Sequence, residues 1–235
     1  MDKVDIDKLF STLTTQLKGA KGHITVDLAG VKCKVISKDA IGHIMQEWLF
    51  EWSKSNNIKI IKNEQTQSFP DYFFIDNVGI KHYLEIKNFN YDANPAFDVA
   101  DFYAFVETLP QEIEKLSADY IVFGYHLNED GVLMVPRIWK FKIWEICGKS
   151  KDNHVTAQIR GKNLVDGIDT KGRIQKLRPY RFNHTSTENK FKSPLEFLTA
   201  IQSLLNMNQN TLKNYPGWLD LVKKSYKKTF KTDLS

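Results

Sequence analysis

Two short runs of aromatic and β-branched residues, separated by a turn, place the strongest constraint on how this chain folds. The first run spans residues 71–75 (DYFFI), and the second spans residues 81–87 (KHYLEIK). Such runs are typical of β-strands, and the residues between them, Asp76 to Gly79, are turn formers. The pattern therefore predicts a β-hairpin over residues 71–87, with residues 58–61 (IKII) as a further strand before it.

Helical patterns flank these strands on both sides. Apolar residues at positions 41, 44, 45, 48, 49 and 52 form one face of an amphipathic helix, for which Ser37 or Asp39 is the expected N-cap. After the hairpin, Asn94 and Pro95 are the residue types of a helix N-cap and first turn. We therefore expect a second helix that runs from there towards Leu109.

The second half of the chain continues this mixture of strands and helices. Residues 119–127 (DYIVFGYHL) predict a buried strand, and residues 132–135 predict a strand that returns after a turn. A capping box at Ser193–Glu196 opens a helix, and a last helix is expected from Trp218 into Lys231. The fold class is therefore α/β. We expect one domain over residues 1–235, with a polar region at about 149–190 and a C-terminal helical part at about 193–231.

The composition is that of an ordinary globular protein, with 42% hydrophobic and 26% charged residues among 235. Cys33 and Cys147 lack metal-type spacing, and so few cysteines do not favour a disulfide framework. The acidic start, MDKVDIDKLF, does not resemble a signal peptide, and no apolar run has the length of a membrane span. We therefore expect a soluble, cytoplasmic protein with no membrane partner. The net charge of +5 is weak support for an anionic partner such as nucleic acid.

Three residues of the predicted hairpin carry chemistry: Asp71, which follows a proline, and Glu85 and Lys87 on the second strand. Mg²⁺ is a hard ion that proteins bind through one or two carboxylates, with phosphate oxygens and water completing its coordination. It polarises a phosphoryl oxygen and lowers the pKa of a water, and a neighbouring lysine can orient that water and stabilise charge on phosphorus. These residue types therefore favour Mg²⁺-assisted phosphodiester hydrolysis, with Asp71 and Glu85 as metal ligands.

Hairpin geometry predicts that the three side chains lie together. Residues i and i+2 of a strand share a face, so Glu85 and Lys87 point the same way while Ile86 points into the core. Pairing of the two strands places Asp71 opposite them, and the Ile86 carbonyl is within reach of the same metal. The alternative is a surface hairpin on which Glu85 and Lys87 form an exposed, solvated stripe.

The motif resembles that of the PD-(D/E)xK nuclease superfamily, which includes most type II restriction endonucleases. This resemblance implies a restriction-endonuclease-like fold, with a central mixed β-sheet flanked by helices. In that family a helix before the motif often contributes a further acidic residue; here the helix carries Glu47 and Glu51, and Glu47 fits the catalytic position better. The resemblance extends more loosely over nearly the whole chain, to residues 142–146 (KIWEI), Arg178 and the helix at Trp218.

The resemblance implies a type II restriction endonuclease that works alone, since the chain shows no separate helicase or methyltransferase segment. It implies Mg²⁺ as the cofactor, double-stranded DNA as the substrate, a homodimer on a palindromic site and a cognate DNA methyltransferase as genetic partner. The motif spacing is similar to that of the small, orthodox, blunt-cutting branch. Over its whole length the chain most resembles enzymes that read an interrupted GC-rich palindrome such as GGNNCC.

The polar region at residues 149–190 mixes Arg, Asn and Gln with turn-forming Gly. Arg reads guanine and Asn or Gln reads adenine in the major groove, whereas Lys mostly contacts phosphate. We therefore expect this region to contact DNA, the alternative being a solvated loop. The candidate DNA-binding residues are Arg160, Lys162, Asn163, Arg173, Gln175, Arg178, Arg181 and Asn183.

Two other functional classes remain open on the residues alone. One is a structure-specific PD-(D/E)xK nuclease that repairs DNA or resolves junctions with the same chemistry. The other is a catalytically silent DNA-binding or toxin-like module that keeps the fold by descent, although the intact Asp71, Glu85 and Lys87 disfavour it. Cleavage that depends on DNA structure instead of sequence would distinguish the first class from a restriction endonuclease. A cleavage assay with divalent metal would distinguish the second class, which does not cut DNA.

Overall fold

Two compact units make up the chain, whose structure is a computed structural model that describes residues 5–65, 68–150, 153–159, 162–164, 174–183, 190–207 and 215–235. The first unit comprises residues 1–94 and 118–140, and the second unit comprises residues 95–117 and 141–235. The predicted hairpin site lies in the first unit, and the predicted DNA-reading region lies in the second. The expectation of one domain over residues 1–235 stays a prediction.

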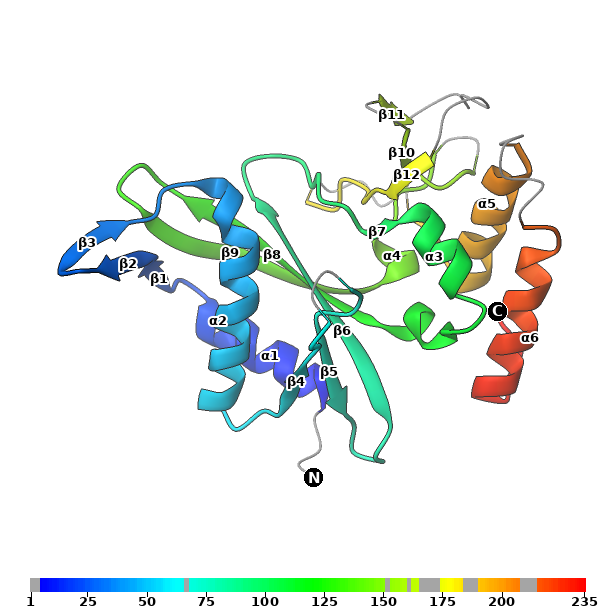
Figure 1. Cartoon of the computed structure of the whole chain (residues 1–235), viewed down its shortest axis with the longest axis horizontal. Helices are drawn as coiled ribbons and strands as arrows, with labels where there is room; N and C mark the ends of the chain where they lie inside the picture. The colour runs from blue at the N-terminus through cyan, green and yellow to red at the C-terminus, as the bar shows by residue number, and fades with distance from the viewer. Residues whose placement is uncertain are drawn as a thin grey trace. The chain divides into compact units, whose positions relative to one another are not determined.

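A six-stranded mixed sheet forms the centre of the first unit (Figure 1). Its strands lie in the order β1-β9-β8-β6-β5-β4, with β6 and β8 parallel and β4, β5 and β6 successively antiparallel. The strands are β1 (Lys21–His23), β4 (Ile60–Lys62), β5 (Tyr72–Ile75), β6 (Lys81–Asn90), β8 (Asp119–Leu127) and β9 (Val132–Lys142). Each strand expected from the sequence is thus present in the sheet, and β5 and β6 form the hairpin predicted over residues 71–87.

β8 lies inside the sheet because its side chains are apolar on both faces. Eight of its nine residues are buried, as expected for a strand covered on both sides. It runs parallel to β6, with Glu85 beside Tyr120 and Lys87 beside Val122. This pairing lays the most buried strand of the unit along the strand that carries two of the candidate catalytic residues.

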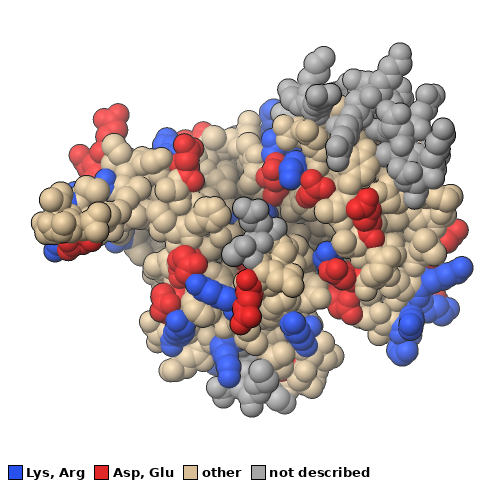
Figure 2. Space-filling view, viewed as in Figure 1, with Lys and Arg blue, Asp and Glu red and all other residues tan. Residues whose placement is uncertain are grey.

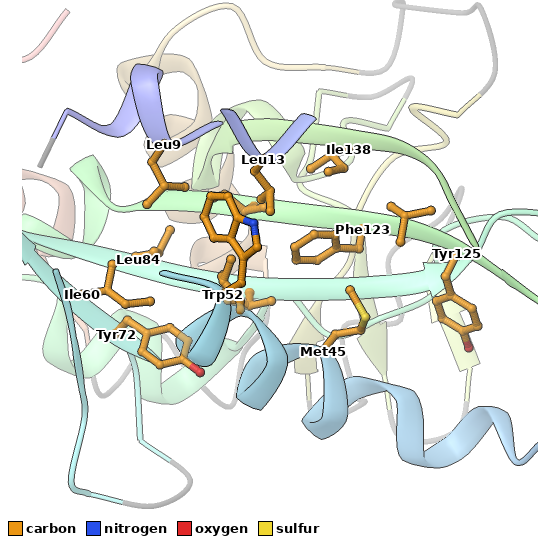
Figure 3. Packing of buried hydrophobic residues seen from close by; sticks show 14 of the residues in the cluster. Leu9, Leu13, Met45, Trp52, Ile60, Tyr72, Leu84, Phe123, Tyr125 and Ile138 are labelled. Carbon is orange, nitrogen blue, oxygen red and sulfur yellow. The ribbon is translucent and has the colours of Figure 1, made fainter. Parts of the chain in front are cut away.

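Two helices, α1 (Ile6–Leu17) and α2 (Ile41–Ser55), pack on this sheet. Figure 3 shows Leu13 of α1 and Met45 and Trp52 of α2 in one buried cluster with Leu84 and Phe123 of the strands. The apolar periodicity of α2 is what turns this face of the helix towards the sheet. The expected α/β class, a central mixed sheet flanked by helices, is confirmed.

The start of α2 differs from the expectation. A 3₁₀ turn, η1 (Lys38–Ala40), precedes the helix, and the N-cap residue of α2 is Ala40 with no side-chain cap hydrogen bond. Capping by the side chain of Ser37 or Asp39 is therefore wrong. The physical reason is that the backbone N–H of Ile41 already donates to the Lys38 carbonyl of the 3₁₀ turn.

The helix expected from Asn94 begins later than the sequence indicated. The helix α3 (Phe102–Thr108) starts after Asp101, whose carboxylate accepts the N–H of Ala104 at 2.9 Å. Before it, the Val99 N–H donates to the Leu177 carbonyl at 2.9 Å and a short strand, β7 (Ala100–Asp101), pairs with β12. Tertiary pairing thus satisfies backbone groups that a helix would otherwise have used.

The second unit contains a four-stranded antiparallel sheet in the order β11-β10-β12-β7. In its helical part, the buried Trp218 indole N–H donates to the Val106 carbonyl at 2.7 Å. Its other elements are η2 (Ile113–Ser117), α4 (Ile143–Ile146), β10 (Ala157–Ile159), β11 (Lys162–Leu164), β12 (Ile174–Leu177), α5 (Pro194–Met207) and α6 (Trp218–Phe230). The last helix, expected from Trp218 into Lys231, is confirmed.

Half of the predicted capping box at α5 is present. The Ser193 hydroxyl accepts the N–H of Glu196 at 3.2 Å, as expected. The Glu196 carboxylate, however, accepts the N–H of Lys192 at 2.6 Å instead of that of Ser193.

The first unit also contains a short antiparallel hairpin formed by β2 (Thr25–Leu28) and β3 (Val31–Lys34). Within the described residues, no helix has the length and apolar character that a membrane crossing requires.

Candidate active site

The β5–β6 hairpin brings Asp71, Glu85 and Lys87 together. Tyr72 pairs with Leu84, which sets Asp71 opposite Glu85. The Asp71 N–H donates to Glu85 Oε2 at 3.2 Å, and the Ile86 N–H donates to Asp71 Oδ2 at 2.8 Å. The Lys87 ammonium donates to Glu85 Oε1 at 2.8 Å. The two carboxylates and the lysine therefore form one bonded cluster across the two strands.

Burial distinguishes this cluster from an exposed charged stripe. Leu84 and Ile86 are in the core, as the alternation of β6 predicts. Glu85 is only 7% exposed, although it carries a carboxylate. Carboxylates are almost never buried unless they are paired or bind a metal, so the alternative of a solvated stripe does not describe this hairpin.

The electrostatic balance of the site favours a cation. Burial raises the pKa of Glu85, and the Asp71 carboxylate raises it further against the opposing effect of Lys87. Burial likewise raises the pKa of Asp71, while the Ile86 N–H and the charge of Lys87 act in the opposite direction. Two carboxylates that repel each other in a desolvated place are stabilised in their charged form by a shared divalent cation.

The residues present fit Mg²⁺. In the described part of the chain, no three His, Cys, Asp or Glu side chains come together as a metal site. The hairpin therefore offers a metal ion two carboxylates, those of Asp71 and Glu85. Two carboxylate ligands suit Mg²⁺, which keeps several waters and takes further oxygens from phosphate. Asp71 and Glu85 would hold the ion, and a role for the Ile86 carbonyl as a further oxygen ligand stays a prediction.

The pKa of Asp71, which burial raises, gives a stability prediction. We expect Asp71→Asn to raise the thermal unfolding midpoint of the metal-free protein by a few degrees at about pH 8. The folded-state pKa of Asp71 lies above its ordinary value of 3.8, so the wild type loses stability as the pH rises through the window between the two values. Asparagine stays neutral throughout, so the difference should vanish at a pH below 3.8.

Thermal unfolding of both proteins in EDTA, at low and high pH, measures this difference. Glu51→Gln on α2 is the matched control, since it removes one carboxylate charge from an exposed pair with Lys54. A metal-free wild type that is as stable as Asp71→Asn at about pH 8 would contradict the raised pKa of Asp71.

The helix α2 places several polar side chains around the hairpin site. The Glu47 carboxylate is ion-paired with Lys62, and the Glu47 side chain is 66% exposed. The side chain of the preceding residue, Gln46, and that of His43, one turn earlier, both lie close enough to lower the pKa of Asp71. A catalytic role for Glu47 stays a prediction, while Gln46 and His43 are the helix residues that lie near Asp71.

Sequence reasoning missed Gln46 because the apolar face of α2 does not specify which flank of the helix meets β5. The Tyr72 hydroxyl sets this flank by donating to the Gln46 carbonyl at 2.7 Å. Burial raises the pKa of Tyr72, and the charges of Glu47 and Asp71 raise it further, so the hydroxyl keeps its proton for this bond. In the sequence, only the acidic residues of this helix, Glu47 and Glu51, indicated a catalytic role.

The candidate DNA-binding residues lie in the second unit, in several different environments. Arg160 and Arg173 lie outside the described residues, and Lys162 and Asn163 are described as β11 backbone alone. Gln175, on β12, and Asn183 are partly exposed, and Arg181 is exposed. The assignment of these eight residues to DNA stays a prediction.

Arg178 has partners inside the second unit. It is ion-paired with Asp98, and its guanidinium donates to the Ala96 carbonyl at 2.9 Å. Its side chain is 19% exposed. These contacts tie the end of β12 to the segment before β7, so Arg178 has a structural task besides any contact with DNA.

The fold and the hairpin site define the chain as a protein of the restriction-endonuclease-like class. The solved structure of the NlaIV restriction endonuclease superposes with a TM-score of 0.84 at 26% identity, covering 100% of this chain and 93% of that one. The family model of the NgoBV restriction endonuclease matches residues 3–235. The chain therefore belongs to the NgoBV restriction endonuclease family.

Curated relatives agree with this family. The chain is 28% identical to the type II restriction enzyme NlaIV of Neisseria lactamica over 239 residues, covering 100% of this chain and 94% of the relative. It is 32% identical to the type II restriction enzyme NgoBV of Neisseria gonorrhoeae over 149 residues, covering 62% of this chain and 84% of the relative. The resemblance to type II restriction endonucleases, and the expectation of a site-specific deoxyribonuclease, are thus confirmed at the level of the family.

Proposed function

We propose that this protein is a Mg²⁺-dependent endonuclease that hydrolyses phosphodiester bonds in double-stranded DNA at a short palindromic site. The observation that carries the proposal is the hydrogen-bonded cluster of Asp71, Glu85 and Lys87 on the β5–β6 hairpin, in which Glu85 is buried. Membership of a restriction endonuclease family supports DNA as the substrate.

Each residue of the cluster has a part in this chemistry. When bound, Mg²⁺ supplies polarisation of the phosphodiester and acidification of water. Asp71 and Glu85 would hold the ion, and the Ile86 N–H orients Asp71 by donating to its Oδ2 at 2.8 Å. Lys87, held by Glu85 at 2.8 Å, orients the attacking water and stabilises the charge that develops on phosphorus.

Cleavage of plasmid DNA tests the proposal. We expect discrete fragments in the presence of Mg²⁺, no cleavage in EDTA, and the same terminal sequence at every cut end. Four-way junctions and flapped duplexes that lack the recognition sequence should remain intact. Cleavage that follows DNA structure regardless of sequence would favour the repair or junction-resolving alternative, and a protein that binds DNA without cutting it would favour the silent module.

The proposal includes the form of the target and the partners. We propose a homodimer, because one active centre cuts one strand and a two-fold axis places a second centre on the other strand. An interrupted GC-rich palindrome of the GGNNCC kind follows from the resemblance described above. A cognate DNA methyltransferase would protect host DNA, and the cytoplasm would be the place of action. Mapping the cut ends of a plasmid with a randomised insert identifies the site.

The second unit is proposed to read the sequence, because the catalytic strands must face phosphate. We expect Arg181→Ala to cost about 1–3 kcal/mol of binding to the cognate duplex and much less on a duplex changed at the base it reads. Gln175→Ala and Asn183→Ala should show the same selectivity for other bases. Lys223→Ala on α6 is the control for loss of one exposed positive charge. Equal losses on both duplexes for every variant would reduce this region to an electrostatic clamp.

A further inference from the structure

The strand β6 continues past the candidate site into a group of aromatic residues on the same face of the sheet. Side chains alternate along a strand, so Phe89 shares the face of Glu85 and Lys87. Asn88 lies on the opposite face, where a Cβ at Gly42 of α2 would meet its amide at 3.5 Å. The face that carries the candidate site therefore extends beyond Lys87 on the side of the sheet away from α2.

Three aromatic rings fill this extension of the face. Trp139 of β9 packs on Phe89 and Tyr91, with ring centroids 5.5 Å and 6.1 Å apart. Gly124 of β8 pairs with Phe89 and leaves room for the rings, since a Cβ there would meet Tyr91 at 2.8 Å and Trp139 at 2.9 Å. Trp139 is only 8% exposed, so its neighbours fix the position of its ring.

Arg137 stands on this aromatic group. It precedes Trp139 by two residues on β9, and its guanidinium carbon lies 5.2 Å from the centroid of the Trp139 ring. Arg137 is exposed, and it is the one arginine in the sequence of residues 1–94 and 118–140. No carboxylate among the described residues pairs with it. A guanidinium that stacks on a fixed ring is held in place, so it loses little conformational entropy when an anion binds.

Cations beside α2 have a different setting. Lys54 is paired with Glu51, and Lys62 is paired with Glu47. Figure 2 shows basic and acidic side chains intermixed over this helix. The positive charges there are compensated by their neighbours, whereas the charge of Arg137 is not. An uncompensated positive charge near a catalytic site attracts the phosphate backbone of a nucleic acid.

We propose that Arg137 binds a backbone phosphate of the DNA beyond the scissile phosphate, on the face of the sheet that carries the candidate site. The inference rests on the proposed function, because it takes duplex DNA at Asp71, Glu85 and Lys87 as its starting point. The side chain has the charge, the exposure and the fixed position that a phosphate contact needs.

The sheet geometry sets where on the DNA this contact falls. Arg137 lies on β9, two strands from β6, and neighbouring strands are about 4.8 Å apart. Two residues along a strand add about 7 Å, so the guanidinium is roughly 10–15 Å from Lys87. This distance corresponds to about three to four nucleotides along one DNA strand. The phosphate therefore lies at the edge of a short recognition site.

A contact of this kind positions the duplex. Phosphate contacts fix the register of a protein on DNA but carry no sequence information. Arg137 therefore has a different task from the second unit, for which base reading is proposed. The guanidinium fork can donate to two phosphate oxygens at once, whereas a lysine acts as a point charge. An arginine is thus better suited than a lysine to hold one phosphate in a defined place.

Duplex binding without metal, which excludes cleavage, tests the proposal. We expect Arg137→Gln to raise the dissociation constant by roughly 10-fold on cognate and base-changed duplexes alike. The slope of log affinity against log salt should fall by about one for each Arg137 that contacts DNA. Arg137→Lys keeps the charge without the fork, so its affinity should lie between the two. Lys59→Gln removes an exposed charge just before β4, and it should leave both affinity and slope unchanged.

Uncharged methylphosphonates locate the phosphate. Each phosphate near the mapped cut is replaced in turn, and binding of the wild type is compared with that of Arg137→Gln. We expect the wild type to lose affinity for a duplex modified about three to four nucleotides from the cut, and Arg137→Gln to lose nothing further there. A merely structural role of Arg137 would instead give losses that add to those of the methylphosphonate at every position. Circular dichroism verifies that the variants are folded.

The inference and the proposed function fail separately. An Arg137→Gln protein with the affinity and salt dependence of the wild type overturns the inference, as do additive losses at every phosphate, and site-specific cleavage by the wild type leaves the function intact. A wild type that binds a mixed-sequence duplex but cuts no DNA with any divalent metal overturns the function. The salt dependence of Arg137→Gln on that same duplex then still decides whether Arg137 binds phosphate.

Discussion

Asp71→Asn is expected to lower the rate of DNA cleavage by roughly 10³-fold or more while sequence-specific binding is kept. The substitution removes one of two carboxylates that would hold Mg²⁺ and leaves the shape of the side chain unchanged. The asparagine oxygen can still accept the Ile86 N–H. Loss of charge, and not loss of fold, is therefore what the experiment measures.

The measurement compares single-turnover cleavage and binding of one cognate duplex. Binding in the absence of metal should be equal or tighter for Asp71→Asn, since one negative charge facing phosphate is gone. Glu51→Gln, which changes an exposed carboxylate of α2, should cut at the wild-type rate. If Asp71→Asn still cuts at close to the wild-type rate, the assignment of the active site to this hairpin fails.

Lys87→Met is the second change with a large expected effect, a loss of roughly 10²- to 10⁴-fold in cleavage rate. Lys87 lowers the pKa of both Asp71 and Glu85. Without it, both carboxylates keep their protons to a higher pH and compete less well for metal. The residual activity of Lys87→Met should therefore need more Mg²⁺ and rise with pH over a range in which the wild type is already constant.

The pH profile separates this role from simple damage to the fold. Lys81→Met, at the exposed start of the same strand, removes the same charge and should leave both the rate and the pH profile unchanged. If the cleavage rate of Lys87→Met falls but its pH and Mg²⁺ dependence do not shift, Lys87 acts only by orienting the attacking water and stabilising charge on phosphorus. A Lys87→Met protein that cuts normally would contradict the proposed mechanism.

The catalytic hairpin could be predicted because the physics that forms it is local. Turn-forming residues at 76–79 and β-type residues on either side set the strand pairing, and alternation along β6 sets which side chains share a face. The register of β5 against β6 then places Asp71 opposite Glu85 without any distant contact. The residue types then favoured a metal site, because two carboxylates beside a lysine are what Mg²⁺-assisted phosphodiester hydrolysis needs.

Contacts between distant segments were not predictable in this way. The segment after Asn94 carried helix-start residues, but its backbone pairs with β12, about eighty residues later in the chain. The same applies to Arg178, which bonds to Asp98 and to the Ala96 carbonyl. Local propensity is a weak preference that tertiary hydrogen bonds override.

Residue types and spacing alone thus settled the α/β class, the hairpin and the three residues of the candidate site. The tertiary structure decided which flank of α2 lies near Asp71: the side chains of Gln46 and His43 are close enough to lower the pKa of Asp71, and the Tyr72 hydroxyl donates to the Gln46 carbonyl. It also decided that Glu85 is only 7% exposed, because alternation along β6 does not specify which segments pack on its face. A short-range pattern specifies which side chains share a face, whereas what that face meets depends on segments that only folding brings together.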